Sequence, residues 1–319
     1  KECAVWAGAV GGLAPAHSYF SNDSSIAYTM TIDTVSFFSD YGTRDEFVGV
    51  VKGVIADIAA HARVIDITHE IPAFDVRAGS LAIARSVPYL PSGVVLAVVD
   101  PGVGSTRKGI AIEVSGGVFI GPDNGLLASG VALAGGAQRA FELNNPDYQL
   151  VAPGATFAGR DIFAPAAAHL CNGVPLTSLG AEIDPASLMP GLVPLHRTEG
   201  EQVHSEVTWI DRYGNCQLNV GPHDVEQFGT PLQVKIVGSD ASPSIVRSAH
   251  VVHSFSEIGG GLGLVIDSYG MLAICMDRAS AAAELDAAVG MEVVLSASTE
   301  EGVSAAVRLT RKSDPGSNS

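Results

Sequence analysis

The sequence predicts an α/β fold in two parts: a Rossmann-like N-terminal domain with a mostly parallel sheet, followed by an antiparallel β C-terminal domain. From Thr34 to about Pro190, apolar strands alternate with amphipathic helices, the pattern of parallel strands joined by helical crossovers. Beyond about Thr198, short strands are separated by turn residues, which is typical of antiparallel sheets. The run Val94–Val99 is aliphatic throughout and leads directly to Asp100, so it predicts a buried parallel strand ending in a carboxylate at the sheet's carboxyl edge.

Length and composition favour two domains with sizeable cores, since the chain has 319 residues, of which 47% are hydrophobic and 16% charged. We expect an N-terminal extension over residues 1–32, an α/β domain over 33–195, a β domain over 196–311 and a polar tail over 312–319. The residues before Met30 are interpreted either as the remnant of a secretory signal or as an extension upstream of the natural start.

The formal charge of −16 argues against a nucleic-acid partner, because Lys and Arg contacts to phosphate dominate that binding. The charge suits a cationic ligand, although solubility alone also accounts for it. No apolar run is long enough to span a bilayer, so no membrane partner is expected. Cys3, Cys171, Cys216 and Cys275 show neither CxxC spacing nor the density of a disulfide scaffold, which predicts reduced thiols, with Cys171 and Cys275 in the core.

The first predicted strand, Thr34–Phe38, ends at the turn Ser39–Gly42, which contains an aspartate. Thr43 and Glu46 have the T-x-x-E spacing of a capping box and therefore predict a helix start. The helix that follows carries apolar side chains at helical spacing: Phe47, Val51, Val54, Ile55 and Ile58.

The next strand is Val64–Thr68, after which Asp75 is placed to cap a second helix. Two short strands, Gly109–Val114 and Val118–Ile120, follow the Asp100 strand. The second of them ends in the turn Gly121–Gly125 and leads into an apolar helix. No GxGxxG follows the first strand, which argues against the usual grip on a dinucleotide pyrophosphate.

The C-terminal part contains short predicted strands bounded by turn residues: Val203–Ile210, Cys216–Val220, Leu232–Val237, Leu262–Ile266, Met271–Cys275, Val293–Ala297 and Ala305–Leu309. Two of the turns, Asp211–Asn215 and Asp267–Gly270, each place an aromatic residue beside a polar one. That arrangement suits stacking and hydrogen bonding of a purine, although isolated turns of this kind are more often plain hairpins.

Six motifs occur in an order that resembles a known family. They are Phe38–Gly42, Asp66–His69, Val99–Gly104, Gly121–Gly125, Thr156–Asp161 and Ile210–Asn215. Together they resemble the S-adenosyl-L-methionine (SAM) hydroxide adenosyltransferases, or SAM hydrolases, which are related to the fluorinase and chlorinase. The resemblance covers about Val35 to Leu309, and the family's fold, an α/β domain followed by a β domain, agrees with the patterns above.

The resemblance implies an enzyme, a hydrolase in which water attacks C5′ of SAM and releases adenosine and L-methionine. It implies that Asp100 and Arg107 are two members of a water-activating Asp-Arg-His triad. The third position is Ala158 in this chain, and an alanine cannot accept a proton or hydrogen-bond a water. Three explanations stay open: an introduced substitution that disables the site, a natural enzyme of low activity, or a water organised mainly by Asp100 and Arg107.

The resemblance also implies substrate-binding roles at ten positions. The carboxylate of Asp40 would hold the ribose hydroxyls, and Phe74 would cover the ribose and the sulfonium. Phe157 and Gly159 would line the nucleophile pocket, where the glycine leaves room for water. The remaining six would contact the methionine or adenine moieties: Asp45, Asp211, Tyr213, Asn215, Ser268 and Tyr269.

Two alternatives remain beside the hydrolase. A SAM-dependent halogenase is disfavoured because the Asp100 carboxylate would repel a bound halide. A SAM- or adenosine-binding module without turnover is compatible with Ala158. For the hydrolase we expect SAM as a small-molecule substrate, no cofactor, no metal, and, from the resemblance, a homotrimer with active sites between subunits. The place where SAM is made indicates a cytoplasmic protein.

Overall fold

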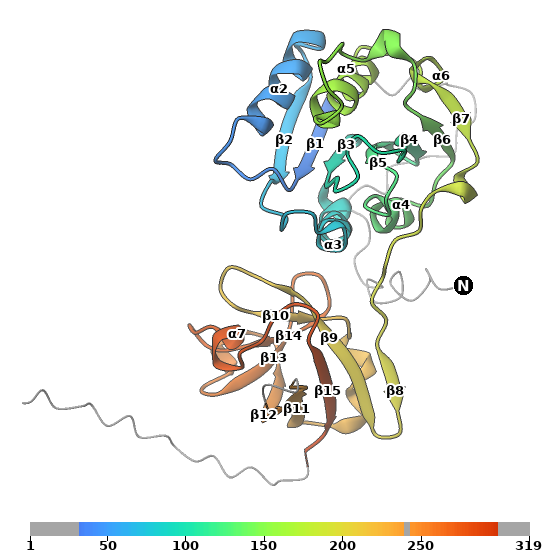
Figure 1. Cartoon of the computed structure of the whole chain (residues 1–319). Coiled ribbons are helices and arrows are strands. Elements are labelled where there is room, and N and C mark those ends of the chain that lie inside the picture. The colour runs from blue at the N-terminus through green and yellow to red at the C-terminus, as the bar shows by residue number, and fades with distance from the viewer. Residues whose placement is uncertain (1–31, 239–242, 299–319) are drawn as a thin grey trace, which may run out of the picture. The chain divides into compact units, whose positions relative to one another are not determined.

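A computed structural model of the chain describes residues 32–238 and 243–298, which divide between Pro194 and Leu195 into two compact units (Figure 1). The predicted strand Ala305–Leu309, the tail over 312–319 and nearly all of the predicted N-terminal extension lie outside the described residues. Each unit has its own hydrophobic core.

A seven-stranded sheet forms the centre of the first unit. In sheet order its strands are β2 (Arg63–Thr68), β1 (Thr34–Ser39), β3 (Gly93–Val98), β5 (Gly117–Pro122), β4 (Gly109–Val114), β6 (Arg139–Glu142) and β7 (Ala181–Ile183). The first four pair in parallel, whereas β4, β6 and β7 each pair antiparallel with the neighbour before them. Because β6 therefore runs with the first four, five of the seven strands share one direction, and the predicted mostly parallel sheet is confirmed.

Helices cover both faces of this sheet (Figure 1). On one face, α2 (Phe47–Ile58) and α5 (Ala164–Cys171) share a core with the alternate strand residues Phe37, Leu96 and Val98. On the other face, the core containing Phe38 and Ala97 includes residues of α3 (Val76–Ser86) and α4 (Ala128–Leu133). The alternation of side chains along β1 and β3 thus feeds two cores, as a doubly wound sheet requires. The shorter helical segments of this unit are η1 (Val87–Tyr89), η2 (Pro146–Tyr148), η3 (Gly159–Phe163), α6 (Leu176–Leu179) and η4 (Pro185–Ser187).

The two predicted helix starts have different outcomes. Asp75 caps α3 as predicted, since its side chain accepts a hydrogen bond from the Ala78 N–H at 2.8 Å. The predicted capping box before α2 is wrong: the helix begins at Phe47, Glu46 makes no side-chain cap bond, and Thr43 Oγ1 donates to Glu70 Oε1 at 3.1 Å. The threonine is used in a contact with the loop after β2 instead of in its own helix.

The second unit is a β-barrel whose sheet order is β10 (Cys216–Leu218), β14 (Leu272–Cys275), β13 (Leu262–Ile266), β12 (Ile245–Val252), β11 (Leu232–Ile236), β15 (Glu292–Ala297), β9 (Gln202–Ile210) and β8 (Arg197–Glu199). A further pairing between β9 and β10 closes the sheet. The pairings are antiparallel except for the parallel pair β12 and β13, which agrees with the predicted antiparallel domain. The short helices of this unit are η5 (Pro222–Asp224), η6 (Glu226–Phe228), η7 (Phe255–Glu257) and α7 (Ala281–Glu284).

Three of the predicted thiols lie in these cores. Cys171, Cys216 and Cys275 are all buried and none is in a disulfide, which confirms the expectation for the described cysteines. Within residues 32–238 and 243–298, no helix is long and apolar enough to cross a membrane.

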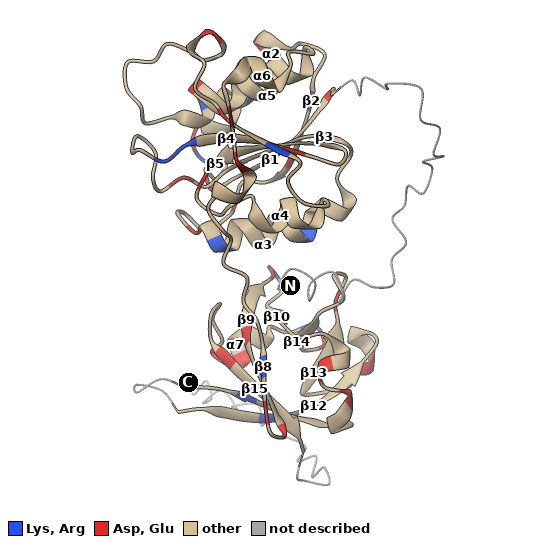
Figure 2. Cartoon of the chain, turned by 90° about the vertical axis from the view of Figure 1, so that its right-hand side faces the viewer, with Lys and Arg blue, Asp and Glu red and all other residues tan. Residues whose placement is uncertain are grey.

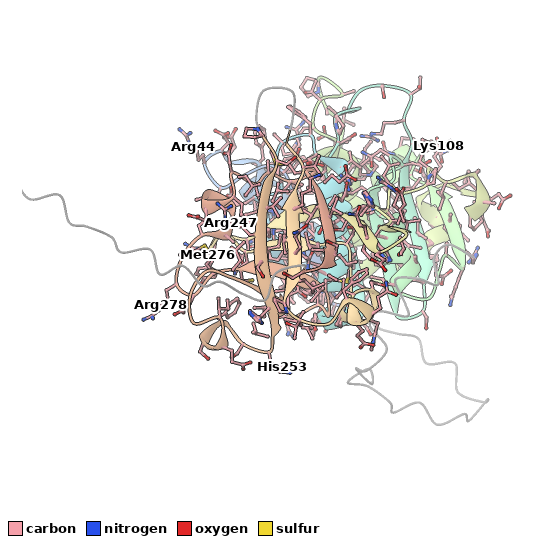
Figure 3. The ribbon with its side chains drawn as sticks, turned by 90° about the horizontal axis from the view of Figure 1, so that it is seen from below. Arg44, Lys108, Arg247, His253, Met276 and Arg278 are labelled. Atoms are coloured by element: carbon pink, nitrogen blue, oxygen red, sulfur yellow. The ribbon has the colours of Figure 1, made fainter. Side chains whose placement is uncertain are left out.

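Lys, Arg, Asp and Glu residues are spread along the chain of both units (Figure 2). Several cations lie beside acids rather than in a basic cluster: Lys108 Nζ is 3.5 Å from Glu142, and Arg278, which is largely exposed, pairs with Asp277 at 3.0 Å (Figure 3).

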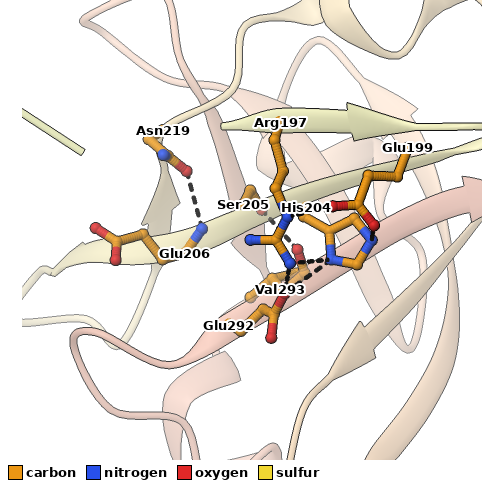
Figure 4. A network of polar contacts seen from close by, with 8 residues as sticks. All are labelled: Arg197, Glu199, His204, Ser205, Glu206, Asn219, Glu292 and Val293. Carbon is orange, nitrogen blue, oxygen red and sulfur yellow. Dashed lines mark hydrogen bonds and ion pairs between the residues drawn. The ribbon is translucent and has the colours of Figure 1, made fainter. Parts of the chain in front are cut away.

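A network of polar contacts fastens the edge strand β8 to the barrel (Figure 4). His204 Nδ1 on β9 lies 2.7 Å from Glu292 Oε1 on β15, and Arg197 Nη2 on β8 donates to the same oxygen at 3.0 Å. The other end of the imidazole, Nε2, is 3.7 Å from Glu199. The hydrogen bond with His204, together with the Arg197 charge, lowers the pKa of Glu292 below its ordinary value.

Glu292→Gln should therefore lower the free energy of unfolding at pH 7, by about 0.5–1 kcal/mol for a pair this exposed. A carboxylate with a lowered folded-state pKa contributes stability above its ordinary value of about 4.3 and loses it as the pH falls through the folded-state value. Urea unfolding at pH 7 and at pH 3 measures the difference. Glu201→Gln, at an exposed glutamate of the same hairpin, is the control. An equal penalty at both pH values would contradict the ionic contribution.

Candidate active site

Asp100 and Arg107 form a paired carboxylate and guanidinium beside the carboxyl end of β3. Arg107 Nε donates to Asp100 Oδ1 at 2.8 Å, and Nη2 donates to Oδ2 of the same carboxylate. The side chain of Arg107 is only 14% exposed and that of Asp100 only 6%. The Arg107 guanidinium carbon lies 5.3 Å from the centre of the Phe163 ring. The strand ends at Val98, so Asp100 stands in the following turn and not on the strand's last residue as predicted. Two parallel hydrogen bonds and a stacked ring hold the pair in one orientation.

The loop between these two residues is folded back on itself and against a second loop. The Val103 N–H donates to the Asp100 carbonyl at 3.2 Å, and Ser105 Oγ donates to the Gly102 carbonyl at 2.6 Å. Gly104 has φ +78°, and a side chain on it would come within 3.0 Å of the Ala155 carbonyl. Glycine at 104 therefore lets the Asp100 loop lie directly against the loop that leads to Ala158.

Asp40 lies beyond the end of β1, at the same edge of the sheet. Its Oδ2 accepts a hydrogen bond from the Phe74 N–H at 2.9 Å. Burial raises the pKa of Asp40, and the negative charge of Asp100 raises it further, while the Phe74 hydrogen bond opposes both. Phe74 has φ +69° and a ring that is 71% exposed. The contact thus holds an exposed aromatic ring beside the carboxylate, as a cover for a bound ligand requires.

Ala158 is buried directly before the π-helical segment η3, between two residues with predicted roles. The Phe157 ring packs edge-on against Phe47 at a centroid distance of 5.2 Å. Gly159 is also buried, but the predicted room for water beside it is wrong, because the Tyr41 hydroxyl fills the place where a side chain at 159 would be. The glycine is needed for the close approach of a tyrosine.

Tyr41 is a site residue that the sequence analysis missed, although it stands beside Asp40 in a quoted motif. Its ring packs edge-on against Phe157 at 5.7 Å and at a tilt against Phe47 at 5.6 Å. Burial raises the pKa of Tyr41, and the charges of Asp40 and Asp100 raise it further. A tyrosine after an acidic residue at a strand end was the available signal, and the contact with Gly159 is visible only in the folded chain.

In the barrel, the two predicted turns are both present and each is shaped by its own aspartate. Asp211 Oδ1 accepts from the N–H groups of Tyr213 and Asn215 at 2.8 and 2.9 Å, and Asn215 Nδ2 donates to Asp211 Oδ2 at 2.8 Å. Asp267 Oδ1 accepts from the Tyr269 and Met271 N–H groups at 2.8 and 3.0 Å. These are hydrogen-bonded Asx turns, which hold a loop tip in a fixed shape.

The side chains carried by these turns differ in exposure. Tyr213 is 73% exposed and Ser268 is also exposed, so both side chains are accessible in this unit. The Tyr269 ring lies 6.2 Å from that of Trp209. The turns stand at the two ends of β10, since Asn215 precedes that strand and Leu272 N–H bonds to the Val220 carbonyl just beyond it. The structure therefore places these residues in two groups, one at each end of β10.

Other polar residues are used in structural contacts. Asn124 Nδ2 donates to the Val99 carbonyl at 2.9 Å and so holds the strand that leads to Asp100. His69 is buried, with Nδ1 2.8 Å from Ser39 Oγ. Asp45 is exposed on the loop before α2, and the described contacts assign it no partner. No group of three or more His, Cys, Asp or Glu side chains in the described ranges is placed to hold a metal.

An apolar cavity of about 260 Å³ lies elsewhere in the first unit, lined by residues of β4 and α4 and by the segment 185–190. None of the predicted site residues lines it. The chemistry of the charged cluster at the sheet edge is therefore separate from this cavity.

Comparisons with known proteins agree along most of the chain. The model described as "SAM hydroxide adenosyltransferase N-terminal domain" matches residues 35–180, and the corresponding C-terminal domain model matches 205–294. A protein of Salinispora tropica named (R)-S-adenosyl-L-methionine hydrolase is 42% identical over 249 residues, covering 78% of this chain and 92% of its own. One of the same name from Thermus thermophilus is 38% identical, covering 82% and 98%.

A more distant relative and a solved structure also match most of this chain. A fluorinase of Actinopolyspora mzabensis is 26% identical over 287 residues, covering 81% of this chain and 95% of its own. The crystal structure of an uncharacterized conserved protein from Thermotoga maritima superposes with a TM-score of 0.74 at 34% identity, covering 82% of this chain and 99% of that one.

Proposed function

Because the chain belongs to the SAM hydroxide adenosyltransferase family, we propose that it is a SAM hydrolase, in which water displaces L-methionine from C5′ and leaves adenosine. Relatives named SAM hydrolase are 32–42% identical to it, whereas the fluorinases are 26–27% identical. The observation that carries the proposal is the buried Asp100–Arg107 pair at the edge of the sheet, with Asp40 and Tyr41 beside it.

In this reaction the leaving group needs no assistance from the protein, whereas the attacking water does. The water oxygen forms a bond to C5′, the C5′–S bond breaks, and its electron pair neutralises the sulfonium, so methionine leaves as a neutral thioether. No acid is required for that leaving group. The water must lose a proton, and its pKa in bulk is about 15.7. The site therefore has to orient and partly deprotonate the nucleophile.

Asp100 is arranged to orient that water. A carboxylate has about four lone-pair sites, and Arg107 uses one on each oxygen. The remaining sites can accept a hydrogen bond from water while the guanidinium keeps the carboxylate from turning. A lone pair of the water oxygen then points toward C5′, and this fixed orientation lowers the barrier to attack.

The charge of the site suits a cationic substrate. Asp40 and Asp100 are close enough for the charge of one to raise the pKa of the other's carboxyl group, as seen for Asp40. A sulfonium near two carboxylates gains Coulomb energy, whereas a halide ion would be repelled. This favours water over halide as the nucleophile and is the reason to rank the halogenase lower.

The substrate contacts are part of the same proposal. Asp40 would bind the ribose hydroxyls through the lone pairs not used by Phe74, whose exposed ring would cover the ribose. In the barrel, the exposed Tyr213 would stack on adenine and Asn215 would use its amide oxygen at the base edge, since its amide nitrogen is engaged. The other proposed contacts are Asp45, Phe157, Gly159, Asp211, Ser268 and Tyr269.

The proposal extends to partners. We propose that SAM is the small-molecule substrate and that no cofactor or metal takes part, with the Asp100 carboxylate orienting the water instead. A homotrimer is proposed from the family resemblance, and light scattering of the full chain tests it. A cytoplasmic location is proposed because SAM is made there.

The test is turnover of SAM in ¹⁸O-labelled water by the purified chain. We expect adenosine and L-methionine in equal amounts, with the label in the 5′-hydroxyl. Product without label would rule out attack by water at C5′. Calorimetric binding of SAM without any product would favour the binding module, and halide-dependent 5′-halo-adenosine would favour the halogenase.

A further inference from the structure

The Tyr41 hydroxyl lies beside the position where the family resemblance calls for a histidine. It touches the main chain of Gly159, the residue after Ala158, so closely that no side chain fits at 159. The ring that carries it packs against Phe157, the residue before Ala158, with ring centroids 5.7 Å apart. The phenol thus contacts both neighbours of the alanine from the end of a different strand.

This hydroxyl also belongs to the charged corner of the site. The Asp40 N–H donates to the Val98 carbonyl at 3.3 Å, which ties the residue before Tyr41 to the strand that leads to Asp100. In agreement with this, burial raises the pKa of Tyr41, the charges of Asp40 and Asp100 raise it further, and Arg107 opposes them. Arg107 in turn packs on Phe163, which ends the π-helical segment that begins at Gly159. The loops after β1 and β3 and the start of η3 therefore meet around the phenol.

The hydroxyl has hydrogen-bonding capacity to spare. Tyr41 uses its main-chain N–H with Ser39 Oγ at 3.4 Å, and its phenolic oxygen makes no hydrogen bond with any other residue in the described part of the chain. A phenol that stays protonated is one donor and also an acceptor. A polar group in a largely buried place normally has a partner, so a bound water or substrate is the natural one.

We propose that Tyr41 Oη orients the attacking water in place of the absent imidazole at position 158, accepting one of its hydrogen bonds while Asp100 accepts the other. This role rests on the proposed SAM hydrolysis. Two acceptors fix both protons of the water, so its lone pair is directed away from them. The phenol's own proton is not used in a hydrogen bond with another described residue, so it stays available to the substrate or to a second water.

The bland explanation is that the tyrosine only fills space against Gly159. The two explanations differ when position 158 is given a histidine. A space-filling phenol matters equally in both backgrounds, whereas a stand-in for the imidazole becomes redundant once the imidazole is present.

The experiment is Tyr41→Phe in the chain with Ala158 and in the Ala158→His chain, with Tyr148→Phe as the control. Phenylalanine keeps the ring contacts with Phe47 and Phe157, and Tyr148 packs on His169 in the same unit. In the chain with Ala158 we expect Tyr41→Phe to lower kcat about tenfold with KM within twofold, as for loss of one net hydrogen bond worth about 1.4 kcal/mol. In the Ala158→His chain the loss should be under threefold, and Tyr148→Phe should change kcat less than twofold in either.

Equal losses in both backgrounds, a change confined to KM, or no loss at all would overturn the role of Tyr41 while leaving SAM hydrolysis in place. Absence of turnover from both the chain with Ala158 and the Ala158→His chain would reject the proposed function, and this role with it. An inactive chain with Ala158 beside an active Ala158→His chain would show that the phenol does not replace the imidazole.

Discussion

Asp100→Asn is expected to lower kcat for SAM cleavage by about 10²–10⁴-fold, the usual effect of removing a positioned acid–base group, with a much smaller change in KM. The amide is nearly the same size as the carboxylate, but it presents an NH₂ group to the guanidinium or to the water where an acceptor is needed. The nucleophile then loses its orienting charge, and Arg107 loses a paired contact in a place where it is only 14% exposed.

The change also affects folding, because removing one partner of a buried ion pair costs about 3–5 kcal/mol. Activity must therefore be measured on protein shown to be folded by circular dichroism, below the midpoint of its own thermal transition. Glu182→Gln is the matched control, since Arg139 binds Glu182 through Nε and Nη2 at 3.0 and 2.8 Å at an exposed edge of the same sheet. A folded Asp100→Asn protein with kcat within threefold of the control would contradict the role of the carboxylate.

Most of the first unit could be predicted because its strands and helices are defined by local patterns. The runs at β1, β3 and α2 are apolar at the period of the element they form, and both faces of β1 are buried, as expected of a parallel strand. The strands that were missed are β6, β7, β8 and β12. Of these, β7 and β8 have three residues each, too few to show a period, and they exist through pairing with a longer neighbour.

The predicted capping box was also wrong because of a contact with another part of the chain. The Thr43 hydroxyl is satisfied by Glu70, a residue of another loop, and this competes with the local bond that the motif predicts. The spacing of residues in the sequence shows which hydrogen bonds a helix cap can make. Which of them forms depends on the contacts of the folded chain.

In the candidate site, too, the features set by local sequence could be predicted, whereas those made by contacts between distant residues could not. Asp40 and Asp100 could be placed at one sheet edge because each follows a strand of a parallel sheet, and parallel strands end together. The contact between Tyr41 and Gly159 could not be foreseen, since it joins residues far apart in the chain through a close approach of ring and main chain. The barrel turns were recognised as turns, but the use of Asp211 as an internal acceptor emerged only from its hydrogen bonds.

Ala158→His is expected to raise kcat at least tenfold, because a positioned imidazole contributes about 10²–10⁴ when it acts as a general base and part of that effect is already supplied by the neighbouring groups. The position is buried, and the residues on either side of it, Phe157 and Gly159, both contact Tyr41 through its ring or its hydroxyl.

The pH profile separates a base from a space-filling group. With an ordinary imidazole pKa of about 6.5, the gain in kcat should be present above that value and should disappear as the pH falls below it and the ring becomes protonated. Ala158→Asn, which is polar but does not titrate, should show neither the gain nor the new limb of the profile. If Ala158→His and Ala158→Asn gave the same rate at pH 8, the imidazole would have no role as a base, and water activation would rest on Asp100, Arg107 and Tyr41 alone.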